Sequence, residues 1–160
     1  MEYAMAFADT GHLCVATLHA NNANQAIERI MHLAPPNMHQ KLRFDLSHNI
    51  RAIVAQQLVP TIDGKGRVAA IEILLNTPLV SDLIQRNEIG MLKEAMMKGK
   101  EQGMQSFDMA LYALYKENRI SEEQAMHNAD SPNDLRLMIK LDSQEGAGLG
   151  SLSDVSIDMG

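Results

Sequence analysis

The sequence predicts an α/β protein in which a short buried strand and a hairpin are combined with many helices. Residues 13–18 form an uncharged apolar run of strand length, which is typical of an inner strand of a parallel sheet. Residues 57–61 and 67–75 flank the sequence Asp-Gly-Lys-Gly at 63–66, which favours a β-hairpin. Most other segments show the apolar spacing and the capping residues of helices.

The elements before the hairpin are predicted from caps and apolar stripes. Residues 1–9 have the pattern of the end of a helix, with Gly11 as its C-cap. Asn21 or Asn22 can cap a second helix that ends before Pro35-Pro36. A third helix is expected over about residues 37–55, with one apolar face formed by Leu42, Leu46, Ile50, Ile53 and Val54. A helix that starts at the first residue without a cap suggests that the chain is part of something longer.

After the hairpin the chain is predicted to be helical as far as residue 141. Helices are expected over about 78–86 and 89–98, and a last one up to about 141. Their starts and those of the helices between them are marked by Thr77 before Pro78, by Ser106, by Ser121 in the capping-box sequence Ser-Glu-Glu-Gln, and by Ser131 before Pro132. Residues 142–160 contain Gly, Ser and Asp with little apolar content, so a disordered tail is expected there.

Composition and charge argue against several classes of protein. The net charge of −6 does not favour binding to a phosphate backbone, so no nucleic-acid partner is expected. The sequence contains no apolar stretch of about 18 residues that could span a membrane. Cys14 is the single cysteine, so a disulfide framework is impossible, and we expect it to be a small core residue. The histidines lack a compact ligand spacing, and no metal site is expected within the chain.

His19 directly follows the predicted inner strand and precedes a loop rich in asparagine. In open α/β sheets, ligands bind beyond the carboxyl ends of the strands. An imidazole there can donate a hydrogen bond to a phosphate oxygen, and Thr17 and the asparagines add small polar groups. Alternatively, His19 is a satisfied histidine at the edge of the core and the asparagines only cap a helix. We expect His32, His39 and His48 to be surface or packing residues.

Two motifs that would identify an enzyme are absent from the sequence. The phosphate-binding pattern G-x-x-x-x-G-K-[ST] does not occur, and neither does the G-x-S-x-G pattern of a nucleophile elbow. The residues present therefore provide no complete catalytic constellation.

Three segments nevertheless resemble one family. The segment ADTGHLCVATLHANNANQAIERI (8–30) resembles the His box of secretion-type hexameric ATPases, specifically the type IV pilus retraction ATPases of the PilT/PilU family. The resemblance continues through residues 54–111, VAQQLVPTIDGKGRVAAIEILL and beyond, and the segment ADSPNDLRLMIKL (129–141) is similar to the PilU type. It covers about residues 1–141.

The resemblance implies a fold and a set of site residues. Residues 1–76 would be the C-terminal part of a RecA-like P-loop ATPase core, with the His box and the hairpin, and residues 77–141 a helical C-terminal region. His12 and His19 match the His-box histidines, so His19 would contact the γ-phosphate region while His12 supports the same site. Gln56 and Leu58 are weak candidates for adenine contacts.

The resemblance also implies cofactors, partners and a location. Members of the family use ATP and Mg²⁺ to power pilus retraction and twitching motility. They act as homo-hexamers or with a partner pilus ATPase, against an inner-membrane pilus platform protein. They are cytoplasmic, at the inner face of the cytoplasmic membrane and peripheral to it.

The sequence departs from the family pattern at its front. The phosphate-binding loop (Walker A), the acidic box and the Walker B motif would all lie before Met1, so the chain is expected to be a C-terminal fragment that is inactive alone. Residues 78–86, PLVSDLIQR, keep only part of the AIRNLIRE motif of PilT. An alternative is a non-enzymatic interaction module that docks on complete ATPase subunits through residues 105–141. An open reading frame ahead of Met1 with a Walker A motif would favour the fragment.

Overall fold

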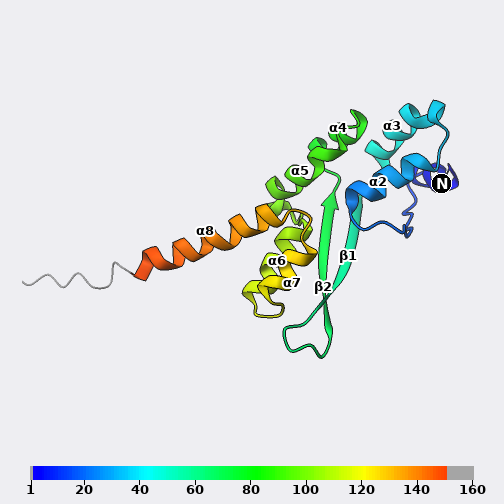
Figure 1. Cartoon of the computed structure of the whole chain (residues 1–160). Coiled ribbons are helices and arrows are strands. Elements are labelled where there is room, and N and C mark those ends of the chain that lie inside the picture. Colours follow the sequence, from blue (N-terminus) through cyan, green and yellow to red (C-terminus); the bar gives the residue numbers. More distant parts are fainter. Residues whose placement is uncertain (1, 151–160) are drawn as a thin grey trace, which may run out of the picture.

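The computed structural model describes the backbone of residues 2–150 and the side chains of residues 3–142. Its helices lie along one long hairpin of two strands (Figure 1). The elements in chain order are α1 (Glu2–Asp9), α2 (Ala23–His32), η1 (Pro36–Met38), α3 (His39–Asn49), β1 (Ala52–Pro60), β2 (Arg67–Leu75), α4 (Pro78–Gln85), η2 (Ile89–Met91), α5 (Leu92–Lys98), η3 (Lys100–Gln102), α6 (Phe107–Lys116), α7 (Glu122–Asn128) and α8 (Pro132–Gly150).

The predicted hairpin is confirmed, and it organises the rest of the fold. β1 and β2 pair antiparallel from Ala52 opposite Leu75 to Pro60 opposite Arg67. Gly64 in the connecting loop has a φ of 66°, a backbone conformation that glycine adopts at low cost. Alternate side chains of β2 are buried while their neighbours are more exposed. Helices therefore cover one face of the hairpin.

Two apolar clusters lie along that buried face. Leu74 of β2 packs with buried side chains from α2, α3, α4 and α5. Val68 and Ala70 pack with Phe107 and other buried side chains from α6, α7 and α8. Glu72, only 2% exposed, lies between these residues on the same face of the strand. The hairpin therefore joins the α2–α5 cluster to the α6–α8 cluster, and a carboxylate lies on the shared strand between them.

The predicted inner strand at residues 13–18 is absent from the structure. This segment is irregular, Leu13 and Val15 are 83% and 86% exposed, and Cys14 is an exposed thiol rather than a core residue. A strand forms only when neighbouring strands accept its backbone hydrogen bonds. Among the described residues, β1 and β2 pair with each other and not with this segment.

The third predicted helix is shorter than expected. α3 ends at Asn49, Ile50 has extended dihedral angles, and β1 begins at Ala52. Ile53 and Val54 therefore belong to the strand, opposite Leu74 and Ile73. The apolar spacing of residues 50–55 fits a helix face, but β-branched residues also favour a strand, and pairing with β2 satisfies the backbone.

The predicted helix starts are confirmed by their caps. A side-chain oxygen accepts a hydrogen bond from a backbone N–H in the first turn of four helices, from Asn22, Thr77, Ser106 and Ser121. α8 continues to Gly150 and projects from the body of the molecule (Figure 1), so residues 142–150 are helical rather than irregular. The rest of the expected tail, 151–160, lies outside the described residues. No helix between residues 2 and 150 combines the length and apolarity needed to cross a bilayer.

Candidate functional site

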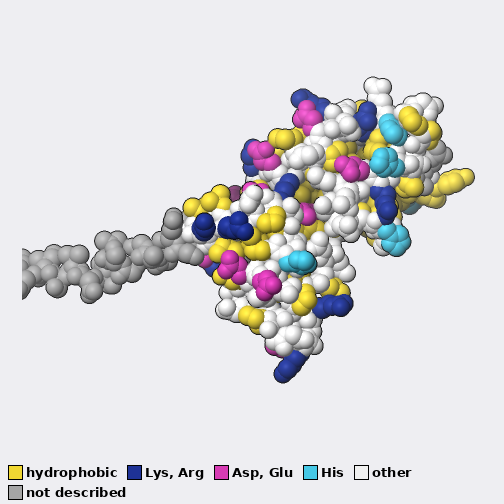
Figure 2. Space-filling model, in the orientation of Figure 1, with side chains coloured by type: hydrophobic (Ala, Val, Ile, Leu, Met, Phe, Trp, Pro, Cys, Tyr) yellow, Lys and Arg dark blue, Asp and Glu magenta, His cyan; other side chains and the backbone are white. Residues whose placement is uncertain are grey.

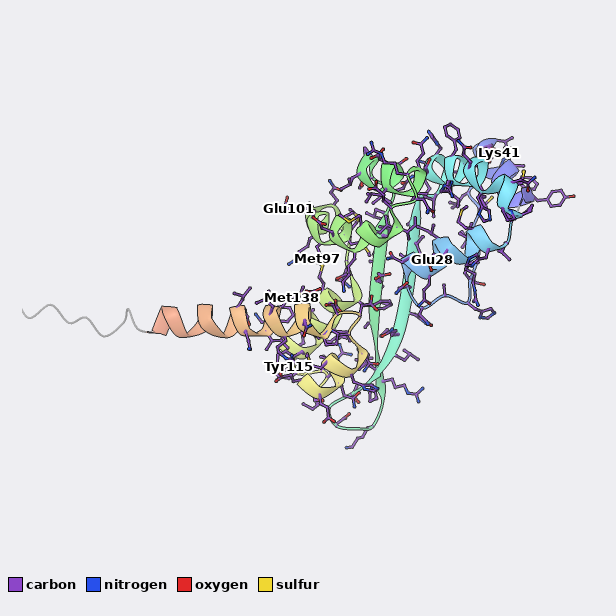
Figure 3. The ribbon with its side chains drawn as sticks, turned by 45° about the horizontal axis from the view of Figure 1, so that its top comes forward. Glu28, Lys41, Met97, Glu101, Tyr115 and Met138 are labelled. Carbon is purple, nitrogen blue, oxygen red and sulfur yellow. The ribbon has the colours of Figure 1, made fainter. Side chains whose placement is uncertain are left out.

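His19 lies at a surface pocket of about 480 Å³ beside α2. The loop before α2, here called the His19 loop, supplies His19, Ala20 and Asn21. The exposed side of α2 supplies Gln25, Glu28, Arg29 and His32, and Leu33 follows the helix. A second pocket of about 300 Å³ shares Glu28 and His32 with it and adds His39 and Arg43 from α3. Glu28 is labelled on α2 in Figure 3. The exposed side of α2 therefore borders two hollows that contain histidine and arginine side chains.

The position of His19 is fixed from both sides of its loop. The guanidinium of Arg29 donates a hydrogen bond to the backbone carbonyl of His19. Asn22 caps α2, because its Oδ1 accepts a hydrogen bond of 2.9 Å from the Gln25 backbone N–H. The loop therefore leads into a capped helix three residues after His19. Arg29, farther along that helix, binds back to the loop.

Cationic and hydrogen-bonding groups surround this pocket. Figure 2 shows histidine side chains gathered at the end of the molecule that contains α2 and α3, with lysine or arginine side chains among them. Arginine donates to phosphate oxygens in a planar fork, and each imidazole can donate through a ring nitrogen. Glu28 is the carboxylate in the wall of the pocket. The donors fit contacts to one side of a phosphate group.

His12 does not line the pocket of His19. It follows the C-terminus of α1, where Gly11 has a φ of 86° and the His12 N–H donates to the Phe7 carbonyl at 3.1 Å. Its Nδ1 lies 3.0 Å from the hydroxyl of Thr10, and its ring meets the ring of Phe7 edge to face. The structure thus gives His12 local contacts with α1. The supporting role at the His19 site remains a prediction.

The other predicted contact residues are also apart from the pocket. Thr17 is exposed in the irregular segment. Gln56 and Leu58 lie on β1 with exposed side chains, on the face that the helices leave uncovered. Neither is in the pocket wall. The predicted adenine contacts of Gln56 and Leu58 stay a prediction. An exposed strand face can still bind a ligand that this structure does not contain.

The pocket fits a phosphate only in part. A nucleotide-binding site surrounds its phosphates with backbone N–H groups from a glycine-rich loop, and no such loop is present in the sequence. Over the described residues, no cluster of three or more His, Cys, Asp or Glu could hold a metal ion. Arg29, His19 and His32 can donate to a phosphate, but they do not enclose one.

Sequence reasoning missed two features near this site. The helix pattern of the sequence assigns Arg29 no contact outside its helix, although Arg29 binds the His19 carbonyl ten residues earlier. Glu72 lies at every second position of β2 together with Val68, Ala70 and Leu74, and this alternation indicates a buried side chain. Burial raises the pKa of Glu72 above its ordinary value, while the hydrogen bond from the Ala23 N–H opposes that shift.

Comparison with known proteins identifies the class to which the chain belongs. The family model described as "Type II/IV secretion system protein" matches residues 1–146, and the chain belongs to this family. The type IV pilus ATPase PilU of Pseudomonas aeruginosa is 62% identical over 147 residues, which cover 92% of this chain and 38% of that protein. The pilus retraction ATPase PilT of the same organism is 36% identical over 129 residues, or 81% of this chain and 37% of PilT.

Solved structures agree with this assignment. The crystal structure of the pilus retraction motor PilT with bound ADP superposes with a TM-score of 0.73 at 36% identity, covering 84% of this chain and 37% of that one. The ATPase DotB of Yersinia pseudotuberculosis gives a TM-score of 0.67 at 27% identity, covering 79% and 32%. The predicted fold class, the C-terminal part of an ATPase domain followed by a helical region, is confirmed. The chain spans less than two fifths of the length of these relatives.

Proposed function

We propose that this chain is the C-terminal portion of a PilU-like motor ATPase that couples ATP hydrolysis to type IV pilus retraction and twitching motility. The observation that carries the proposal is the 62% identity to PilU across 92% of the chain, which includes the His19 loop, α2 and the hairpin. The hexameric assembly, the partner ATPase, the pilus platform protein and the place at the inner face of the membrane belong to the same proposal. So does the role of residues 1–76 as core and of residues 77–141 as appended region.

In this proposal His19 responds to the terminal phosphate of the nucleotide. Its backbone carbonyl is bound by Arg29 and its loop is tied to the capped start of α2, so the imidazole starts from a restrained position. A positioned donor stabilises charge that develops on a phosphate oxygen. ATP and Mg²⁺ would supply the reacting phosphate and its counter-charge. The glycine-rich loop would come from residues outside this chain, so the chain alone is expected not to bind ATP tightly.

A chimeric protein tests the proposal. Residues 1–147 would replace the matched segment of P. aeruginosa PilU, and ATP hydrolysis would be measured on the purified chimera, with twitching scored in cells whose own copy is removed. The unmodified chimera should hydrolyse ATP. His19→Ala should lower kcat by roughly a hundredfold or more, as expected for the loss of one positioned donor.

His48→Ala provides the matched control. His48 is exposed on α3, and its ring stacks on Phe44 at 4.4 Å between centroids, away from the His19 pocket. Its removal should leave kcat within about twofold, a difference well below 1 kcal/mol. An active chimera in which both substitutions have the same small effect would refute the role of His19. A folded chimera without ATP hydrolysis would refute the motor function of this chain.

A further inference from the structure

Glu72 occupies a position where the fold would be expected to place an apolar residue. On β2 it lies between Ala70 and Leu74 on the buried face, and Ala55 of β1 is directly opposite. Burying a carboxylate is costly unless hydrogen bonds compensate it. A well-packed apolar side chain at such a site is often as stable or more stable. The presence of Glu72 therefore requires an explanation from its contacts.

The Glu72 carboxylate accepts hydrogen bonds from the first residues of two helices. The backbone N–H of Ala23, which begins α2, donates to its Oε1 at 2.7 Å. The backbone N–H of Phe107, which begins α6, is its second backbone donor. The first N–H groups of a helix have no partner within the helix, and its N-terminus favours negative charge. One buried side chain thus joins the start of α2 to the start of α6.

A second connection runs from α6 to the same end of α2. Asp108, the next residue of α6, is 1% exposed and forms an ion pair with Lys93 of α5. Its Oδ1 accepts a hydrogen bond from the Asp130 N–H at 2.8 Å, in the turn between α7 and α8. The side chain of Asn22, the residue that caps α2, lies close enough to the Asp130 carboxyl for hydrogen bonding between them to lower the pKa of Asp130.

Both connections end at adjacent residues just after the His19 loop. The side chain of Asn22 interacts with the Asp130 carboxyl, and the backbone N–H of Ala23 donates to Glu72. Asp108 and Asp130 repel each other, and Lys93 offsets part of that repulsion. The start of α2 is therefore attached to β2, to α6 and to the turn before α8, three residues after His19. None of these three carboxylates lines the His19 pocket.

We propose that Glu72 and Asp130 are positioning residues, which hold the start of α2 and thereby the His19 loop and connect this loop to the helical region after the hairpin. The proposal rests on the proposed role of His19. A shift in the helical region at α6 or at the turn before α8 would be transmitted to His19 through these two side chains. A misplacement of about 1 Å of a catalytic group can cost roughly a hundredfold in rate.

Amide hydrogen exchange on the 160-residue chain tests the connection without any activity. Glu72→Ala and Asp130→Ala should each speed exchange at residues 19–25 at least about tenfold, while exchange within β1 and β2 changes less than about twofold. Glu72→Gln should stay near wild type, since the amide oxygen still accepts from Ala23. Glu101→Ala, at an exposed carboxylate in η3, is the matched control.

Uniformly faster exchange along the chain, or unchanged exchange at residues 19–25 in both alanine variants, would overturn the proposal. If Glu72→Ala fails to fold, Asp130→Ala and Glu72→Gln still decide, because Asp130 is exposed and Gln keeps the shape of Glu. In that case local acceleration by Asp130→Ala supports the connection and its absence overturns it.

The PilU chimera tests whether the connection acts through His19. Glu72→Ala should lower kcat roughly tenfold or more, and the effect should largely vanish when His19→Ala is already present, because the two residues would act on one step. A merely structural role gives additive losses. If exchange changes locally but ATP hydrolysis by an active chimera does not depend on His19, the proposed function is refuted and the attachment of α2 stands. If kcat of the chimera depends on His19 but is unchanged by Glu72→Ala and by Asp130→Ala, the positioning role is refuted.

Discussion

Removal of Lys93 should destabilise the protein far more than removal of another lysine on the same helix. Lys93 is 25% exposed and pairs with Asp108, which is 1% exposed. Lys93→Met keeps most of the apolar stem but leaves the Asp108 carboxylate buried with two backbone donors, the N–H groups of Asp130 and Ser131. Removing one partner of a buried ion pair costs about 3–5 kcal/mol. At about 2–4 °C per kcal/mol for a chain of this size, Tm should fall by roughly 6–20 °C.

The control for this prediction is Lys98→Met on α5. Lys98 pairs with Glu94 four residues earlier, and their side chains are 68% and 52% exposed. Exposed pairs of this kind contribute about 0.3–0.5 kcal/mol, so Tm should fall by about 2 °C or less. Thermal and urea unfolding followed by circular dichroism would measure both variants.

A double substitution separates the ion pair from other effects. Asp108→Asn removes the charge but keeps an oxygen that accepts from Asp130. Once Asp108 is neutral, Lys93→Met should cost about 1 kcal/mol or less, because no buried charge is left unpaired. Equal losses for Lys93→Met and Lys98→Met, or strict additivity of the double variant, would contradict the reasoning.

Further predictions concern the Glu72 carboxyl, the Ser121 cap and ATP hydrolysis. Burial raises the pKa of Glu72 above its ordinary value of 4.5, so its contribution to stability is full below pH 4.5 and is lost as pH rises through the raised pKa. Glu72→Gln should remove that part of the pH dependence, which urea unfolding would measure as pH rises above about 4.5, and an unchanged curve would argue against it. Ser121→Ala removes the acceptor for the Gln124 N–H and should cost about 1 kcal/mol in thermal unfolding; a loss below about 0.2 kcal/mol would show that the cap is not needed. The 160-residue chain alone should not hydrolyse ATP in a phosphate-release assay, and turnover abolished by His19→Ala would disprove this.

Much of the fold could be predicted because its signals are local. Thr77 before Pro78, Ser106 and Ser121 mark helix starts through bonds to residues three positions away. The hairpin is also local, since its loop chemistry and the apolar runs on either side are adjacent in the sequence. These elements therefore appear in the structure where the sequence indicated them.

The strand at residues 13–18 could not be decided in the same way. Its apolar composition fits a strand, but a strand exists only with a partner, and the described part of the chain offers it none. The extent of β1 was likewise decided by β2, because residues 52–56 pair with 71–75. In both cases a distant segment, and not the local pattern, determines the outcome.

The site was predicted in part. The sequence argument for His19 depends on a strand end that the structure does not contain, because residues 13–18 are irregular. His19 nevertheless lines a pocket, and its role there stays a prediction. The Arg29 contact with His19 was within reach of the sequence, since both belong to one helix and its preceding loop. The pair of Lys93 and Asp108 was not, because fifteen residues separate them and no periodic pattern links a lysine on one helix to an aspartate on another.

The long sequence separation of the Glu72 contact has a consequence for the order in which the protein folds. β1 and β2 are joined by a short loop, whereas Ala23 and Glu72 are 49 residues apart. Closing a longer loop costs more chain entropy before any contact compensates for it. We therefore expect the hairpin to assemble first and α2 to dock on it late, so that substitutions at Ala23 or Glu72 mainly speed unfolding and substitutions within the hairpin mainly slow folding.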